Sequence, residues 1–181
     1  MRLIECPLPG VAVLEPTVFR DARGFFFESY NRSLLRELTG FDGEFVQDNH
    51  SSSVRNVLRG LHYQVQQPQG KLVRVVQGEV YDVVVDLRRS STHFGKWAAV
   101  RLSEHDKRML WVPPGFAHGF LVLSDTCQFL YKVTDYWAPA HERCLRWNDP
   151  ALAIDWPLTG EPIVSAKDAA GQLLAEAEVY P

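Results

Sequence analysis

The sequence has few cysteines, little excess charge and no long apolar run, and each shortage excludes a class of protein. The three cysteines, Cys6, Cys127 and Cys144, are an odd number at no metal-binding spacing, which predicts free thiols in a reducing compartment. The net charge of -3 argues against non-specific binding to nucleic acid. No stretch approaches the length of a membrane span, and the first ten residues lack the apolar run of a signal peptide. We therefore expect a cytoplasmic protein that binds neither membranes nor nucleic acid.

The rest of the composition is typical of a globular protein. Of the 181 residues, 46% are hydrophobic and 23% are charged, enough for one domain with a sizeable core. No repeat, low-complexity run or linker divides the chain, so a single domain over residues 1–181 is expected. An anionic ligand would have to be held by a local cluster of arginines and lysines.

Short strands dominate the predicted secondary structure. One or two are expected in residues 11–19, broken by Pro16, and another begins at Phe25 after a turn at residues 21–24. Further strands are predicted at residues 44–53, 56–64, 71–77, 79–88, 96–103, 107–113, 118–124 and 126–137. Turns rich in Gly, Asp, Pro or Ser separate them. Many short strands at regular spacing predict a mainly β fold, a closed sandwich or barrel.

Two helices are expected. Residues 31–40 carry a leucine stripe, with Asn31 or Ser33 as the N-cap and Gly40 at the C-terminal end. A second, short helix is predicted around residues 169–178, at the end of a C-terminal wrap (residues 147–181). The wrap should pack Trp147 and Trp156 onto the barrel.

Residues 59–71, RGLHYQVQQPQGK, are the stretch richest in candidate chemistry. Leu61 and Tyr63 alternate with His62 and Gln64, a strand pattern, and a loop with Pro and Gly leads to the next strand at Lys71. Neighbouring strands would bring His62 and Lys71 close enough to act on one small molecule. A core histidine and a surface lysine are the alternative.

Other polar residues are sorted by the same alternation. Gln47 and Asn49 share one face of their strand, which we expect to face the interior, where either a polar ligand or the backbone satisfies their amides. Asp48 and His50 then face outward. Tyr131 shares a face with Phe129 and Val133 and is either a core ring or an acid opposite a base.

Three aspartates are candidates to orient a functional group. Asp82 and Asp86 lie on one face of a strongly apolar strand and must be paired there, with an imidazole or an arginine. Asp168, in SAKDAA, is another candidate for orienting the His62 imidazole. The sequence leaves open whether Asp82 or Asp168 does so.

A metal site is not expected. A Pro-Gly turn before His118, in PPGFAHGF, resembles the second motif of the cupins, but HYQ at residues 62–64 lacks two of the usual three ligands of the first motif. His62 and His118 alone are too few protein ligands for a typical structural or catalytic site.

Five motifs in order, RGLHYQ, QGKLVRVVQGEVYDVVVDLR, PPGFAHGF, YKVTDYW and SAKD, make the chain resemble the dTDP-4-dehydrorhamnose 3,5-epimerase family, metal-free members of the cupin superfamily. The match runs from about residue 19 to residue 168. The resemblance implies a jelly-roll, cupin-like β-barrel and a homodimer that shares strands between subunits, with no cofactor. It implies epimerisation at C3 and C5 of dTDP-4-dehydro-6-deoxy-D-glucose, giving dTDP-4-dehydro-L-rhamnose for dTDP-L-rhamnose biosynthesis.

The resemblance also implies roles for single residues. His62 matches the general base, Tyr131 the general acid, Lys71 the lysine near the sugar carbonyl, and Asp168 the partner of His62. Substrate-binding positions are matched by Arg23, Phe26, Glu28, Gln47, Asp48, Asn49, Arg59, His118, Trp137, Glu142 and Lys167.

Two of these matches conflict with strand alternation. Asp48 should face outward, so that its main chain rather than its carboxylate would be the contact. Arg59 and His62 have opposite parity on one strand, which a bulge or twist at Gly60 would reconcile.

Other activities remain open at this point. A related enzyme could epimerise a dTDP-4-keto-6-deoxy sugar at one carbon only. A non-catalytic sugar-nucleotide-binding barrel or a metal-dependent cupin would be a different class. The presence of a base, an acid and a carbonyl-side lysine disfavours a pure binder.

Overall fold

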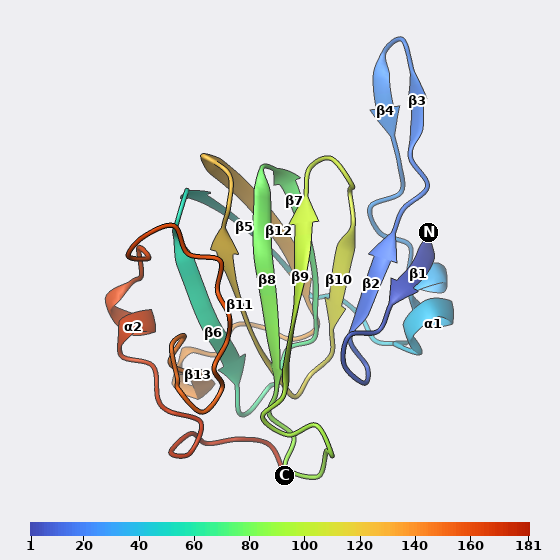
Figure 1. Ribbon diagram of the computed structural model, residues 1–181. Coiled ribbons are helices and arrows are strands. Elements are labelled where there is room, and N and C mark those ends of the chain that lie inside the picture. Colours follow the sequence, from blue (N-terminus) through green and yellow to red (C-terminus); the bar gives the residue numbers. More distant parts are fainter.

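Two antiparallel β-sheets face each other and enclose the core (Figure 1). The computed structural model describes residues 1–181. One sheet has the order β1-β2-β10-β7-β12-β5 and the other β13-β6-β11-β8-β9, while β3 and β4 form a separate hairpin. The strands of the first sheet are β1 (Arg2–Glu5), β2 (Ala12–Glu15), β10 (Met109–Val112), β7 (Lys71–Gln77), β12 (Thr126–Val133) and β5 (Gln47–Val54). Those of the second are β13 (Glu142–Cys144), β6 (Leu58–Gln64), β11 (Phe116–Val122), β8 (Glu79–Asp86) and β9 (Trp97–Ser103).

The alternation of strand residues gives the second sheet two different buried faces. Val84 of β8 belongs to the cluster between the sheets, together with Val73 of β7 and Phe129 of β12. Val83 and Val85 point the other way and join a second cluster under the C-terminal segment. The side chain of Asp82 therefore points between the sheets.

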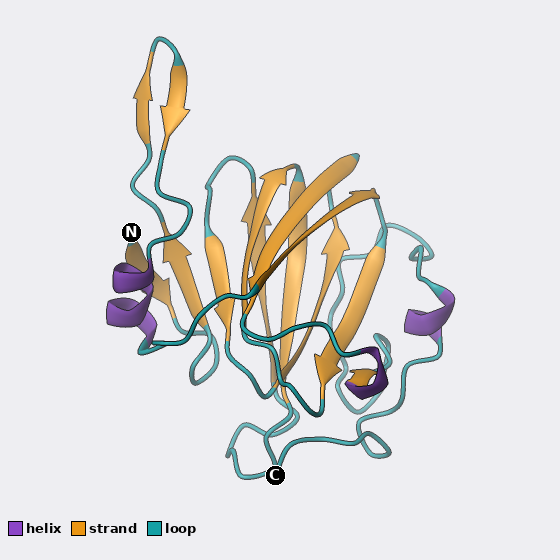
Figure 2. Cartoon of the chain, turned by 180° about the vertical axis from the view of Figure 1, so that it is seen from behind, coloured by secondary structure: helices purple, strands orange, loops and turns teal.

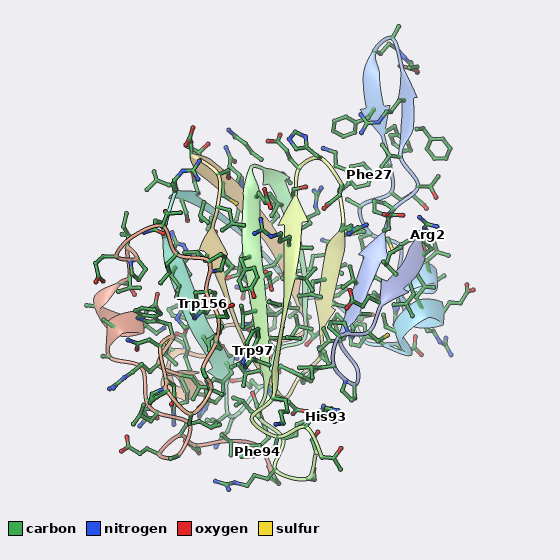
Figure 3. All side chains as sticks on the ribbon, in the orientation of Figure 1. Arg2, Phe27, His93, Phe94, Trp97 and Trp156 are labelled. Carbon is green, nitrogen blue, oxygen red and sulfur yellow. The ribbon has the colours of Figure 1, made fainter.

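The C-terminal segment covers the outer face of the second sheet, as the two tryptophans predict. Trp156 is 8% exposed in the cluster on that face, and Trp147 packs against the same cluster. The indole of Trp97, on β9, donates to the Leu152 carbonyl at 2.9 Å, and Figure 3 shows Trp97 and Trp156 over this sheet. These contacts hold the segment that leads to α2 (Ala166–Ala169) against the outer face of the second sheet.

The predicted first helix is confirmed, whereas the predicted helix at residues 169–178 is wrong. In α1 (Arg32–Thr39), the side chain of Asn31 accepts from the Leu34 amide, and Gly40 ends the helix at φ 76°. The second helix, α2, is only one turn long. Beyond it, the Gln172 amide donates to the Cys144 carbonyl at 2.9 Å, so bonding to a distant segment replaces helical bonding. Neither helix is long and apolar enough to cross a membrane.

The hairpin of β3 (Phe19–Asp21) and β4 (Gly24–Phe26) projects away from both sheets, as both views show (Figures 1 and 2). Its aromatic side chains are open: Phe19 is 62%, Phe25 53% and Phe26 69% exposed. A group of exposed apolar rings of this kind is typical of an interaction surface.

Candidate active site

A cavity of about 380 Å³ lies between the sheets and collects most of the predicted site residues. Those that line it are Gln47, Asn49, Arg59, His62, Lys71, His118, Tyr131, Trp137 and Glu142. They come from strands of both sheets and from the segment between β12 and β13. The two sheets thus place polar groups on opposite walls of one cavity.

Gly60 lets Arg59 and His62 line the same cavity despite their opposite parity. Its φ is +112°, a conformation that side chains rarely adopt, and a Cβ there would lie 2.7 Å from the Cα of Gly119 on β11. The pairing of β6 with β11 shifts register at this point. This is the irregularity that the sequence predicts.

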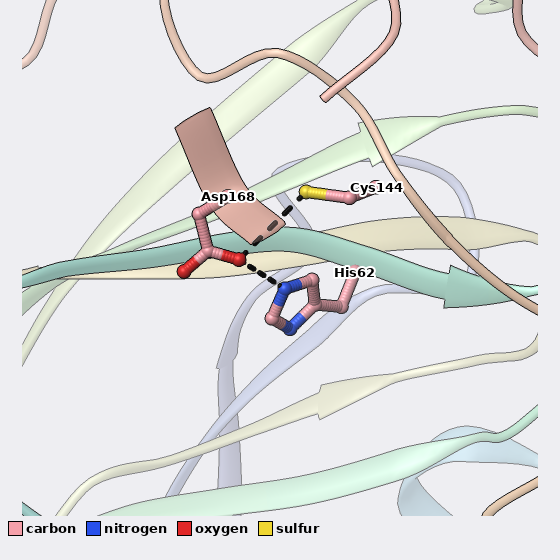
Figure 4. A group of neighbouring side chains, drawn as sticks. All are labelled: His62, Cys144 and Asp168. Atoms are coloured by element: carbon pink, nitrogen blue, oxygen red, sulfur yellow. Dashed lines mark hydrogen bonds and ion pairs between the residues drawn. The ribbon is translucent and has the colours of Figure 1, made fainter. Parts of the chain in front are cut away.

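His62 is held by Asp168. Its Nε2 lies 2.5 Å from Asp168 Oδ1, and the carboxylate is 4% exposed in its side chain (Figure 4). The Ser165 hydroxyl caps α2 by accepting from the Asp168 amide at 3.1 Å. Burial by itself raises the pKa of Asp168. The hydrogen bond from His62 and the positive charge of that ring act more strongly in the other direction, so the pKa of Asp168 is lowered overall. The other ring nitrogen, Nδ1, points away from the carboxylate.

Asp82 orients His118 instead. His118 Nε2 lies 2.8 Å from Asp82 Oδ1, with both residues buried. Burial raises the pKa of Asp82, although His118 and Lys71 oppose it, and Oδ2 of Asp82 is buried without a hydrogen-bond partner. The structure therefore answers the open question: Asp168 contacts His62, Asp82 contacts His118, and Asp86 pairs with an arginine, Arg88, at 2.7 Å.

Lys71 reaches His62 across the sandwich. The sequence suggested that the two residues lie on neighbouring strands. This is wrong, because β6 and β7 belong to opposite sheets. The Lys71 ammonium nevertheless donates to the His62 carbonyl at 3.2 Å and is 7% exposed. Burial lowers the pKa of Lys71 to about 8, although Asp82 and Glu142 act against this. A cation so little hydrated can interact strongly with a negative charge in the cavity.

Tyr131 stands on β12, in the sheet opposite His62. The side chain of Tyr131 lines the cavity. Burial first, and then the charge of Glu142, raise the pKa of Tyr131, although Arg59 opposes them. The phenol is thus protonated at neutral pH and able to donate.

Polar contacts at the cavity organise the residues near Trp137. Glu142 accepts from the Trp137 indole at 3.0 Å and from the Lys167 ammonium at 2.5 Å. The amide of Gln47 donates to Asn49 Oδ1 at 2.9 Å, and its oxygen accepts from the Trp137 backbone at 3.2 Å. Lys167 itself is half exposed beside the cavity rather than in its lining.

Besides Lys167, four predicted binding residues lie outside this cavity. Asp48 faces outward, as alternation predicts, and its carboxylate pairs with Lys132 at 3.0 Å. Arg23 and Phe26 are on the projecting hairpin, and Glu28 follows it. In a single chain these residues do not contribute to the cavity.

Several lining residues were not identified from the sequence. Ser51 continues the face of Gln47 and Asn49, and Gln64 continues the face of His62, so extending the alternation by one step would have found both. Gln69 and Gly119 gave no such signal, because one lies in a loop and the other carries no side chain.

A cupin-like sandwich with an imidazole backed by a carboxylate, a buried ammonium and a phenol in one cavity has the groups that an acid–base isomerase needs. Comparison with known proteins agrees. The model of the family dTDP-4-dehydrorhamnose 3,5-epimerase matches residues 5–176. The chain belongs to this family, whose members are epimerases.

Close relatives cover the chain from end to end. It is 58% identical to dTDP-4-dehydrorhamnose 3,5-epimerase of Pseudomonas aeruginosa, over 100% of both chains. A crystal structure of dTDP-6-deoxy-D-glucose-3,5-epimerase from Legionella pneumophila, in complex with dTDP-4-keto-L-rhamnose, is 50% identical with a TM-score of 0.95, covering 98% of this chain and 94% of the other. A 3'-monoepimerase from Streptomyces bikiniensis, in complex with dTDP-quinovose, is 34% identical with a TM-score of 0.87, covering 92% of this chain and 84% of the other.

Proposed function

We propose that this protein converts dTDP-4-dehydro-6-deoxy-D-glucose into dTDP-4-dehydro-L-rhamnose by epimerisation at C3 and C5, in dTDP-L-rhamnose biosynthesis. The observation that carries the proposal is the meeting of His62, Lys71 and Tyr131 in one cavity of a chain that belongs to the 3,5-epimerase family. The thiols of all three cysteines are free, which supports a cytoplasmic location.

The C4 ketone of this substrate acidifies the hydrogens at C3 and C5. His62 is the base that removes each proton, since an imidazole is the side chain most often used as a general base. Its Nδ1 is the atom for this role, because Nε2 is bonded to Asp168. Asp168 fixes the ring and stabilises the imidazolium that forms, as a carboxylate does for a catalytic histidine.

Removing the proton leaves negative charge on O4, and Lys71 is the group that stabilises it. An ammonium held in place before the charge develops needs no reorganisation during the reaction. Reprotonation from the opposite face inverts the carbon, and Tyr131 supplies that proton from the facing sheet. None of these steps calls for electron transfer.

Epimerisation at a single carbon is the second candidate, because a 3'-monoepimerase shares the fold. The higher identity to a 3,5-epimerase, 58% against 34%, favours the first candidate. Incubation with dTDP-4-dehydro-6-deoxy-D-glucose in deuterated water, followed by NMR, distinguishes them. Deuterium at C3 and C5 is expected; deuterium at one carbon indicates the monoepimerase, and deuterium at neither refutes both.

Tyr131→Phe should separate proton removal from inversion. The variant keeps the ring and loses only the hydroxyl, so His62 still forms the enolate and returns a proton to the face it came from. Because His62 exchanges its proton with solvent, C5 should acquire deuterium well in excess of its inversion, as measured by NMR. Equal loss of exchange and inversion, relative to the unchanged protein, would assign Tyr131 to proton removal instead.

We further propose that the protein is a homodimer in which the β3–β4 hairpin of each subunit completes the cavity of the other. Three exposed phenylalanines on the hairpin need a cover, and Arg23 and Phe26, matched to nucleotide contacts, project from their own sheets. An arginine is suited to bind the diphosphate through paired hydrogen bonds.

Complementation between two inactive variants tests this arrangement. Arg23→Ala and His62→Ala should each have little activity alone. Co-expressed, they should regain part of it, because a mixed dimer has one cavity with an intact His62 and an intact hairpin from its partner. No recovery from verified mixed dimers, or a monomer by light scattering at micromolar concentration, would contradict the proposal.

A further inference from the structure

A cluster of three different metal-binding side chains lies behind the proposed base. The ring nitrogen of His62, the thiol of Cys144 and the carboxylate of Asp168 have ligand atoms that all lie within 4.8 Å of one another (Figure 4). Asp168 Oδ1 is the shared atom, 2.5 Å from His62 Nε2 and 3.9 Å from Cys144 Sγ. The proposed reaction uses His62 and Asp168 but gives Cys144 no role.

The fold holds these three groups from separate elements. Cys144 on β13 pairs directly with His62 on β6 in the sheet register, while α2 brings Asp168 to both. Of the three residues only His62 lines the cavity, and its side chain is 31% exposed, so an ion that comes from the cavity must pass the imidazole to reach the cluster.

The spacing is close to what a tetrahedral Zn²⁺ requires. Bonds of about 2.0 Å to nitrogen or oxygen and about 2.3 Å to sulfur place donor atoms roughly 3.3–3.8 Å apart. The Cys144–Asp168 distance of 3.9 Å is close to this range. The His62–Asp168 pair, at 2.5 Å, would open by ~1 Å or less on the same criterion.

We propose that this cluster is an inhibitory site for a thiophilic divalent cation such as Zn²⁺, bound by His62 Nε2, Cys144 Sγ and an Asp168 oxygen. Imidazole, thiolate and carboxylate are all ligands of zinc, and a site with three protein ligands takes a water as the fourth. Burial, and then the charge of Asp168, raise the pKa of the Cys144 thiol to about 12, so the ion must displace that proton to solvent before the sulfur lone pair binds it. The ion is an inhibitor and not a cofactor.

Inhibition follows from the chemistry of the imidazole. A neutral ring has one nitrogen that accepts and one that carries hydrogen. When Nε2 binds the ion, the hydrogen resides on Nδ1, which then has no lone pair for the substrate proton. The ion also breaks the hydrogen bond between His62 and Asp168, so that the base is lost in two ways.

Zn²⁺ titration with a pair of cysteine variants tests the site. Protein treated with a chelator should be fully active, micromolar Zn²⁺ should inhibit it, and renewed chelation should restore it. Cys144→Ser should keep its activity and need at least about tenfold more Zn²⁺ for inhibition, since even the loss of a group that only orients a metal ligand typically costs about 10–100-fold in affinity. Cys6→Ser, which alters an exposed cysteine, should remain as sensitive as the unchanged protein.

Co²⁺ gives a second readout that does not depend on the proposed activity. A thiolate bound to Co²⁺ absorbs in the near ultraviolet, and this band should appear in the unchanged protein and in Cys6→Ser but not in Cys144→Ser. If Cys144→Ser turns out to be poorly active, the Co²⁺ band is the measurement that tests the site. A band that persists in Cys144→Ser, equal Zn²⁺ sensitivity of the two variants, or activity that requires the ion would overturn the proposal.

Discussion

His62→Ala is expected to abolish both epimerisation and the exchange of the C5 hydrogen with deuterated solvent. The variant removes the imidazole that Asp168 backs and that is 31% exposed, whereas the side chain of His118 is only 7% exposed, and no proton leaves carbon without a base. General bases contribute about 10²–10⁴-fold to rates, so turnover should fall by at least that range. The measurement is NMR of C3 and C5 during incubation in deuterated water.

The control for this prediction is His105→Ala, which alters an exposed histidine in the turn between β9 and β10. It should exchange and invert C5 at the normal rate. Retention of exchange in His62→Ala would mean that another group removes the proton. His118, bonded to Asp82 on the wall of the same cavity, would then be the candidate.

Lys71→Met should bind substrate normally and turn it over slowly. The variant keeps most of the buried stem and removes the ammonium, whose interaction with O4 becomes strong only as the enolate forms. Loss of one such group typically costs about 10²–10³ in kcat, and the loss should spare KM. Lys96→Met, at an exposed position before β9, is the matched control and should behave normally. A rise in KM alone would make Lys71 a diphosphate ligand.

The same ammonium should limit the reaction at alkaline pH. Burial lowers the pKa of Lys71 to about 8, and a lysine is charged below its pKa. The value of kcat/KM should therefore fall as the pH rises through about 8, since this parameter reports the free enzyme. This fall in kcat/KM, the alkaline limb of the pH profile, should be absent from the residual activity of Lys71→Met. An alkaline limb unchanged in that variant would assign it to another group.

The sequence by itself predicted which side chains share a strand face. In β5, alternation placed Gln47 and Asn49 inward and Asp48 outward, and the structure confirms all three orientations. The twist at Gly60 was also predicted, from the opposite parity of Arg59 and His62. These properties are local: a strand has a period of two, and a neighbour along the chain is enough to reveal it.

Only the tertiary structure decided which distant groups meet. Asp168 pairs with His62 across 106 positions of the chain and Asp82 with His118 across 36, although both aspartates were candidates for His62. The sequence also treated β6 and β7 as neighbours, whereas they lie in opposite sheets. Periodicity gives the face of a strand but not its partner, because strand order is set by how the whole core closes. For the same reason residues 172–174 bond to the 144–149 segment and form no helix: the packed structure offered their backbone groups partners that no local pattern records.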